Sequence, residues 1–255
     1  MKYLNKPKKR IELFGVKIDP LTMQETLKLA EEIIENRIIT QHVVVNVAKL
    51  VMMQKDKKLK EVVNSCDIIN ADGQGIVWGA RFFGLNIHER VAGIDLMLNV
   101  IRLAAEKKYR VFFLGAEGFV INKAIEKIKS QYPNLQIVGY RDGYFSESEE
   151  EKVTKRIKDS KADILFVGMS SPKKELFLNK FINIMQIPFV MGVGGSFDVL
   201  VSYVKRAPIW MQAMGLEWFY RLISEPKRMW KRYLVTNTIF LWMILKALII
   251  GKRIG

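Results

Sequence analysis

The residues best suited to chemistry follow apolar runs that end in glycine-rich turns. Asp72 lies in the segment 70–75, between an apolar run and a glycine turn. A carboxylate in such a place can serve as a general base when it faces a cleft. The alternative role is structural: Asp72 would cap the helix expected to begin near Gly75. The local pattern alone favours this second interpretation.

Arginines are the second group of interest, because a guanidinium group binds carboxylates and phosphates through paired hydrogen bonds. Arg90, in the segment 89–93, could bind an anionic group; the alternative is a surface ion pair with Glu89 or another acid. If a diphosphate leaves during the reaction, arginines must balance its charge. The C-terminal segment supplies Arg206, Arg221, Arg228 and Arg232.

Glycine loops mark further places where a ligand can approach the backbone. Gly115 ends the apolar run 110–115, and Gly194 and Gly195 follow the run 188–193. Glycine lets a backbone come close to a nucleotide, but it is also the ordinary residue of a tight turn between a strand and a helix. For the turn at Gly115 the sequence supports both interpretations equally.

Absent motifs narrow the chemistry. His42 and His88 are the only histidines and no Asp-x-Asp pair occurs, so we expect neither a histidine-rich metal site nor the usual carboxylate clamp for a metal-bound nucleotide sugar. The sequence also contains no Walker A motif and no Gly-x-Gly-x-x-Gly pattern, which counts against P-loop and typical dinucleotide enzymes.

An alternation of strands and helices must hold these residues in place. Short apolar runs bounded by glycine predict strands, and the charged stretches between them predict helices. The predicted strands are 43–47, 67–70, 110–115, 136–139, 163–168 and 188–193, and the predicted helices are 47–63, 75–83, 93–107, 118–131, 147–160, 172–185 and 196–203. This order is typical of an α/β, Rossmann-like fold, in which helices cover both faces of a parallel sheet and ligands bind beyond the carboxyl ends of the strands.

Two smaller elements precede this alternation. Residues 11–20 predict a short hairpin with Gly15 at its turn. Residues 22–36 predict an amphipathic helix, because Thr22 and Glu25 have the spacing of a capping box.

Positive charge is concentrated at the two ends of the chain. The formal net charge is +15, of which residues 1–10 contribute +5 and residues 205–255 contribute +8, so that 11–204 carries only +2. Cationic ends on a nearly neutral body predict an anionic surface as partner, either nucleic acid or acidic lipid.

The residues that accompany the charge favour a membrane over nucleic acid. Four of the five tryptophans lie in the last 46 residues, and indole rings favour the lipid headgroup boundary. Zinc-finger spacing and RNP-type strands are absent from the sequence. The apolar run 234–250 has 17 residues interrupted by polar side chains, whereas a spanning helix needs about 20 mainly apolar residues. We therefore expect a helix that lies in the membrane plane.

These features divide the chain into an α/β core, 1–204, and a basic, Trp-rich appendage, 205–255, that associates with the membrane. The N-terminal lysines precede no apolar segment of the kind found in secretory signals. A single cysteine, Cys66, is compatible with a reducing compartment. We expect a peripheral protein on the cytoplasmic face of the cell membrane.

In the loops that follow the predicted strands and in the arginine-containing C-terminal segment, the sequence closely resembles the WecG/TagA/CpsF glycosyltransferases, glycosyltransferase family 26. The matching blocks follow the family's order over roughly 11–233: Ala71-Asp72-Gly73-x-Gly75, Glu89-Arg90-Val91-x-Gly93-x-Asp95-Leu96, Tyr132-Pro133 with Gly139 and Gly143-Tyr144-Phe145, Val167-Gly168 with Pro172-Lys173-x-Glu175, Gly192-Val193-Gly194-Gly195-x-Phe197-Asp198, Arg206-Ala207-Pro208, and Glu217-Trp218-x-x-Arg221-Leu222-x-x-Glu225-Pro226-x-Arg228. No single block is diagnostic, but the ordered set is very specific.

The resemblance implies an inverting transferase that needs neither a metal nor a cofactor. Such enzymes move an N-acetylmannosamine-type or related sugar from a UDP donor to an undecaprenyl-diphosphate-linked saccharide. By this resemblance Asp72 is the general base, Arg90 lies near the donor or product, and Arg221 and Arg228 close over the site and neutralise the leaving diphosphate. Gly115, Gly194 and Gly195 are expected to line the donor and diphosphate site.

Two positions depart from the family's pattern. The family usually has Thr-x-Asn at the end of the first core strand, where this chain has Val44-Val45-Asn46; the hydroxyl is lost, but Asn46 remains as a donor-site candidate. Lys174 replaces a glutamine and could pair with a carboxylate or phosphate of donor or acceptor; the alternative is that it points to solvent. We expect both positions to bear on which sugar the donor carries.

Three other functions are compatible with part of the sequence. A soluble nucleotide-binding α/β enzyme would use the cationic tail as a subunit interface in a homo-oligomer. A nucleic-acid-binding module would use the +15 charge, but the nearly neutral body and the clustered tryptophans count against it, so no nucleic-acid partner is expected. A scaffold without activity would have little reason to retain Asp72, Arg90, Arg221 and Arg228 together.

Overall fold

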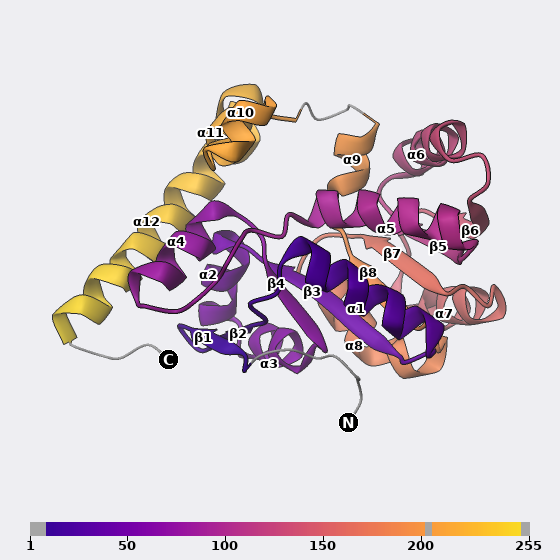
Figure 1. The fold of residues 1–255 in the computed structure, drawn as a ribbon, viewed down its shortest axis with the longest axis horizontal. Coiled ribbons are helices and arrows are strands. Elements are labelled where there is room, and N and C mark those ends of the chain that lie inside the picture. Colours follow the sequence, from indigo (N-terminus) through magenta and orange to yellow (C-terminus); the bar gives the residue numbers. More distant parts are fainter. Residues whose placement is uncertain (1–8, 202–205, 251–255) are drawn as a thin grey trace.

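A parallel sheet of six strands forms the centre of the protein. The computed structural model describes residues 9–201 and 206–250. The strands are β3 (Thr40–Val45), β4 (Ile68–Ala71), β5 (Arg110–Gly115), β6 (Gln136–Arg141), β7 (Ile164–Gly168) and β8 (Phe189–Gly192), in the spatial order β4-β3-β8-β7-β5-β6 (Figure 1). All neighbouring pairs run parallel. Their carboxyl ends therefore meet at one edge of the sheet.

Helices cover both faces of this sheet. One face packs against α1 (Met23–Glu35), α5 (Gly93–Lys107), α6 (Gly118–Gln131) and α9 (Ser196–Leu200). The other packs against α2 (Val47–Lys55), α3 (Lys57–Ser65), α4 (Gln74–Phe82) and α8 (Lys173–Met185), with α7 (Glu150–Asp159) beyond the 3₁₀ turn Glu147–Glu149. Neighbouring strand residues alternate between the faces: Phe113 joins the first core and Phe112 the second. The predicted α/β class is confirmed.

The two small N-terminal elements are also confirmed. A hairpin of β1 (Ile11–Leu13) and β2 (Val16–Ile18) turns at Phe14 and Gly15, which both have positive φ. The capping box of Thr22 and Glu25 opens α1. Asp19 then joins the hairpin to the main sheet, because its amide donates to the carbonyl of Ile69 and its carboxylate accepts from the Ile69 amide, both at 2.8 Å.

The predicted helix 47–63 was wrong, because the structure has two helices there. Asp56 adopts an extended conformation between α2 and α3, and its side chain accepts a hydrogen bond from the Leu59 amide. An aspartate that caps a new helix interrupts the apolar periodicity only slightly, so the sequence pattern runs through the break. The first core strand also begins earlier than predicted, at Thr40, and ends at Val45.

Three helices form the C-terminal appendage: α10 (Ile209–Ala213), α11 (Glu217–Ser224) and α12 (Pro226–Ile250). Figure 1 shows α12 lying along α4 and α2 at one end of the molecule. Phe240 anchors it, since a Cβ at Gly79 of α4 would come within 2.6 Å of the Phe240 ring. The predicted boundary at 204–205 lies outside the described residues. The last helix, α12, runs unbroken from Pro226 to Ile250.

A glycine substitution tests the close approach of two strand ends. A Cβ at Gly115, where φ is +114°, would lie 2.6 Å from the carbonyl of Gly168. We expect Gly115→Ala to lower the free energy of unfolding by at least about 2 kcal/mol, measured by urea denaturation. Gly118→Ala is the matched control: nothing lies within 4 Å of its Cβ, and it should be neutral or stabilising. Equal effects of the two substitutions would contradict this account.

Candidate active site

The candidate residues of the core gather at the carboxyl edge of the sheet. Asp72 follows β4, and Asn46 follows β3, the next strand in the sheet. The loops after β8 and β7 bring Gly194 and Lys174 to the same edge. This is the edge at which open α/β sheets bind their ligands.

Asp72 is not the cap of the following helix. The N-cap of α4 is Gly73, and it makes no side-chain capping hydrogen bond. The Asp72 amide instead donates to the carbonyl of Val45, at 2.8 Å, which fixes the loop against β3. The structural interpretation that the local pattern favoured was therefore wrong. Within the described ranges, no hydrogen bond or ion pair engages the Asp72 carboxylate.

The electrostatic environment of Asp72 suits a base. Burial raises the pKa of this carboxyl, Arg90 opposes that rise, and Glu217 adds to it. Arg221 and Lys49 lower the pKa by smaller amounts. A carboxylate with a raised pKa holds a proton more readily than an exposed one, which is the property that a general base needs.

Arg90 reaches the appendage through a shared carboxylate. Its guanidinium Nη1 donates to Oε2 of Glu217 at 3.0 Å, and Arg221 Nη2 donates to Oε1 of the same group at 3.0 Å. Arg90 pairs with an acid, as the alternative interpretation expected, but this ion pair is largely buried instead of lying at the surface. The partner comes from α11, and the Arg90 side chain is only 16% exposed.

A second ion pair joins the appendage to the core. Arg206 donates to Asp95, in the first turn of α5, at 2.6 Å. Arg206 of the C-terminal segment thus pairs with a residue of the core, and the roles expected for these arginines at a diphosphate stay predictions. Arg228 belongs to the first turn of α12, but its side chain, like that of Arg232, lies outside the described residues.

Lys174 does not point to solvent. It is 4% exposed and runs beneath the glycine loop, so that a Cβ at Gly192 would lie 2.6 Å from its Cε. Its ammonium group lies 3.3 Å from Glu175, which also pairs with Lys49 at 2.8 Å and accepts from the Ser171 hydroxyl at 2.9 Å. Direct contact between Lys174 and the donor stays a prediction.

The charges of this cluster determine its protonation. Burial alone would raise the pKa of Glu175, but Lys49, Lys174 and two hydrogen bonds outweigh it and lower the pKa to about 2. Burial and the charge of Lys49 lower the pKa of Lys174 to about 8, although Glu175 opposes them. The cluster therefore holds a carboxylate and at least one ammonium group under the loop at neutral pH.

The remaining candidate residues each have a structural role in the fold. Their expected contacts with a ligand stay predictions. Asn46 caps α2, since its Oδ1 accepts from the Lys49 amide at 3.0 Å. Gly115 permits the close approach of β5 and β7. Gly194 needs its positive φ of 54° in the turn before α9, and Gly195 is exposed there.

The sequence alone did not reveal Glu217, Asp95, Lys49 or Glu175 as partners of the site. One local signal was present, because Glu217 stands four residues before Arg221 on a helix, the spacing of an ion pair. The pairs Lys49–Glu175, Arg206–Asp95 and Arg90–Glu217 join residues more than a hundred positions apart, and no local pattern indicates them.

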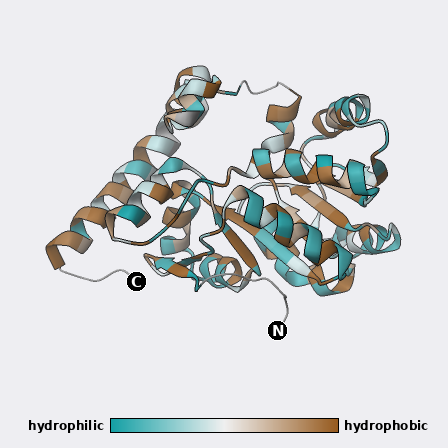
Figure 2. Cartoon of the chain, viewed as in Figure 1, coloured by the Kyte–Doolittle hydropathy of each residue, from teal (hydrophilic) through white to brown (hydrophobic). Residues whose placement is uncertain are grey.

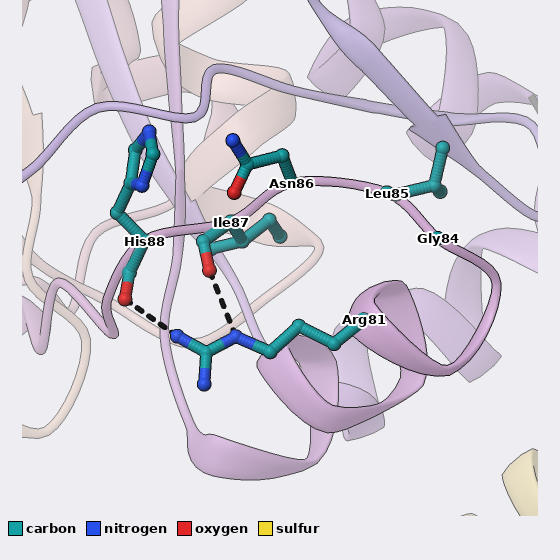
Figure 3. A pocket seen from close by; sticks show the side chains of 6 residues that line it. All are labelled: Arg81, Gly84, Leu85, Asn86, Ile87 and His88. Carbon is teal, nitrogen blue, oxygen red and sulfur yellow. Dashed lines mark hydrogen bonds between the residues drawn. The ribbon is translucent and has the colours of Figure 1, made fainter.

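An open depression elsewhere on the surface does not form part of this site. It lies at the loop after α4, and Figure 3 shows its lining residues: Arg81, Gly84, Leu85, Asn86, Ile87 and His88. Arg81 donates to the carbonyls of Ile87 and His88 at 3.0 and 2.6 Å, so its guanidinium group holds the loop. None of the candidate site residues lines it.

Metal ligands do not gather in the part of the chain that the structure describes. No group of three or more His, Cys, Asp and Glu residues there could hold an ion. The metal-independence expected from the sequence stays a prediction.

The fold and the edge of the sheet define a class of protein: an α/β enzyme with one unengaged carboxylate beside guanidinium groups, suited to transfer from a phosphorylated donor to a hydroxyl group. Comparison with known proteins is more specific. The model of the "Glycosyl transferase WecG/TagA/CpsF family" matches residues 11–254, so the chain belongs to this family and is a glycosyltransferase.

Two curated relatives carry the same name, N-acetylglucosaminyldiphosphoundecaprenol N-acetyl-beta-D-mannosaminyltransferase. The chain is 40% identical to the protein of Bacillus subtilis strain 168 over 180 residues, which are 71% of this chain and 69% of the relative. It is 38% identical to the protein of Bacillus spizizenii, with the same coverage of both chains.

The buried lysine gives a test by pH. A folded pKa of about 8 lies below that of an exposed lysine, so the unfolded chain binds this proton more readily, and stability rises as the pH increases above 8. We expect the free energy of unfolding of the wild type to rise relative to Lys174→Gln by about 1–3 kcal/mol between pH 7 and pH 10. Urea denaturation at each pH measures it.

Lys152→Gln is the control, because this lysine lies exposed on α7. Its difference from the wild type should stay constant over the same range. A pH-independent difference between Lys174→Gln and the wild type would show that folding does not lower the pKa of Lys174.

Proposed function

We propose that this glycosyltransferase moves an N-acetylmannosamine-type sugar from a UDP donor to an undecaprenyl-diphosphate-linked saccharide, with inversion and without a metal. The names of the two relatives support the sugar and the acceptor. One observation carries the mechanism: the unengaged carboxylate of Asp72 lies in the field of Arg90 and Arg221, which a single carboxylate joins.

Asp72 acts as the general base in this reaction. It takes the proton of the acceptor hydroxyl while the hydroxyl oxygen attacks the anomeric carbon of the donor sugar. The bond from that carbon to the diphosphate oxygen breaks with the electron pair staying on UDP. A single displacement of this kind inverts the anomeric configuration.

Arginines neutralise the charge that develops on the leaving diphosphate. Arg90 approaches from the core and Arg221 from the appendage, and Arg228 is proposed to join them. Guanidinium groups held in a partly buried site stabilise such charge without reorganising water. This supplies the electrostatic stabilisation that a divalent ion provides in other nucleotide-sugar enzymes.

The outer face of α12 is proposed to contact the membrane. Exposed apolar side chains recur along one side of the helix: Trp230, Leu234, Leu241, Leu245 and Leu248. The side chains of Met229, Phe240 and Ala247 lie on another side of the helix and are buried, and Phe240 packs against the core. Figure 2 shows that hydrophobic residues dominate the C-terminal half of the helix.

An in-plane helix fits this arrangement better than a span. The segment Tyr233–Ile250 is long and apolar enough to cross a membrane by length and composition alone. Packing of Phe240 against α4, however, commits one face of the helix to the core. The opposite face then meets lipid, with the basic residues near the start of α12 at the anionic headgroups. We place the enzyme on the cytoplasmic face of the membrane.

Replacement of the base tests the mechanism. We expect Asp72→Asn to lower kcat by about 10²–10⁴-fold while the thermal unfolding transition stays in place. Turnover is followed by release of UDP from UDP-N-acetylmannosamine in the presence of a lipid-diphosphate-linked acceptor. A kcat near that of the wild type would rule out Asp72 as the base.

Charges on the outer face of α12 test the membrane contact. Burial of a leucine side chain contributes about 1.5–3 kcal/mol, so Leu241→Glu with Leu245→Glu should lower partition to phosphatidylglycerol-containing vesicles by at least about tenfold. Ile184→Glu is the control, since Ile184 is half exposed on α8. Unchanged co-sedimentation of the double variant would contradict the proposal and favour a subunit interface, which light scattering would reveal as dissociation.

A further inference from the structure

Glu217 places a negative charge between the two arginines that the diphosphate needs. Its carboxylate accepts from Arg90 with one oxygen and from Arg221 with the other, each at 3.0 Å. The side chains of Glu217 and Arg90 are 12% and 16% exposed, so water competes little for this contact. An internal anion thus engages both guanidinium groups.

A carboxylate and a phosphate present the same chemistry to a guanidinium group. Both offer negatively charged oxygens to planar N–H donors, and arginine binds either one through short, charge-assisted hydrogen bonds. The contact with Glu217 therefore has the chemistry that the proposed function assigns to the leaving diphosphate. The two anions repel each other and compete for the same donors.

We infer that Glu217 is the internal counter-ion of the diphosphate site, which exchanges its contacts with Arg90 and Arg221 for those of a nucleoside diphosphate. The inference rests on the proposed function and adds a positioning residue to it. In the empty enzyme Glu217 holds the two arginines together across the core and the appendage. When the diphosphate binds, Glu217 releases both arginines, and after the product leaves it pairs with them again.

This exchange has a physical advantage for turnover. Without an anion the guanidinium groups of Arg90 and Arg221 would repel each other, and the charge of Arg90, whose side chain is 16% exposed, would be left uncompensated at a cost in free energy. A permanent vacancy between them would bind the product UDP very tightly and slow its release. A carboxylate that competes for the arginines keeps the empty site stable and weakens product binding.

The same charge also acts on the base. The groups facing Asp72 are Arg90 from the loop before α5, Glu217 and Arg221 from α11, Lys49 from α2, and Arg206, which precedes α10. Glu217 opposes these cations there. Its neutralisation leaves the cations uncompensated and should make Asp72 easier to ionise.

Binding of UDP to the full-length protein in lipid nanodiscs tests the inference by titration calorimetry. Glu217→Gln removes the charge and keeps the shape, and we expect it to bind UDP at least about fivefold more tightly than the wild type. A role of Glu217 confined to holding the appendage predicts the opposite sign, because loss of the link would misplace the arginines and weaken UDP binding. Glu217→Asp keeps the charge, and its UDP affinity should stay close to that of the wild type.

Phe240→Leu provides the control for docking of the appendage. It removes the ring that packs against Gly79 of α4 and leaves Glu217 between its two arginines. We expect its UDP affinity to change less than about twofold. Unchanged or weaker UDP binding by Glu217→Gln, or equal tightening by Phe240→Leu, would overturn the inference.

The pH dependence of kcat/KM gives a second measurement on the same variant. Asp72 must be ionised to act, so activity falls as the pH drops through its pKa. In Glu217→Gln this acidic limb should move to lower pH by about half a unit or more. An acidic limb of the kcat/KM profile at the same pH as in the wild type would overturn the counter-ion role.

The outcome for the inference stays separate from that for the proposed function. If the wild type fails to bind UDP, the proposed donor is wrong. If the wild type binds UDP and Glu217→Gln does not tighten binding, the donor stands and the counter-ion role falls.

Discussion

A charge removed from water needs a partner of opposite sign, and this requirement organises the carboxyl edge of the sheet. Glu175 is held by Lys49 and Lys174 beneath the glycine loop, and Glu217 is held by Arg90 and Arg221 near Asp72, the proposed base. Asp72 stands apart, since no described side chain pairs with it. The balanced charges around it leave one carboxylate available for chemistry.

The appendage contacts the core, and the proposed membrane contact uses the same set of helices. An ion pair between Glu217 of α11 and Arg90 reaches the vicinity of Asp72, and the next helix, α12, begins two residues after α11 ends. One side of α12 packs against α2 and α4 and the other exposes apolar side chains. The proposed lipid contact and the proposed active-site closure are therefore mechanically connected, because the helix that would meet the membrane continues from the one that carries Glu217 and Arg221.

Much of the fold could be predicted from the sequence, because its signals are local. Apolar runs ending in glycine gave the strands β5, β7 and β8, and the capping box of Thr22 and Glu25 gave the start of α1. The break at Asp56 was missed, because a cap inside a continuing periodic pattern resembles an ordinary helical residue. The solvent-facing interpretation of Lys174 failed for a related reason. A lysine is rarely buried without partners, and the local pattern does not show that Lys174 lies beside the buried ion pair of Lys49 and Glu175.

The sequence by itself determined the α/β alternation, the cationic ends and the place of Asp72 at a strand end, because composition and periodicity are properties of neighbouring residues. Only the tertiary structure decided which charges meet. Arg90 and Glu217 stand 127 positions apart, and each had several other acids or arginines as eligible partners. The choice follows from how the strands order in the sheet and how the appendage docks on it, and these are long-range packing events that no local pattern encodes.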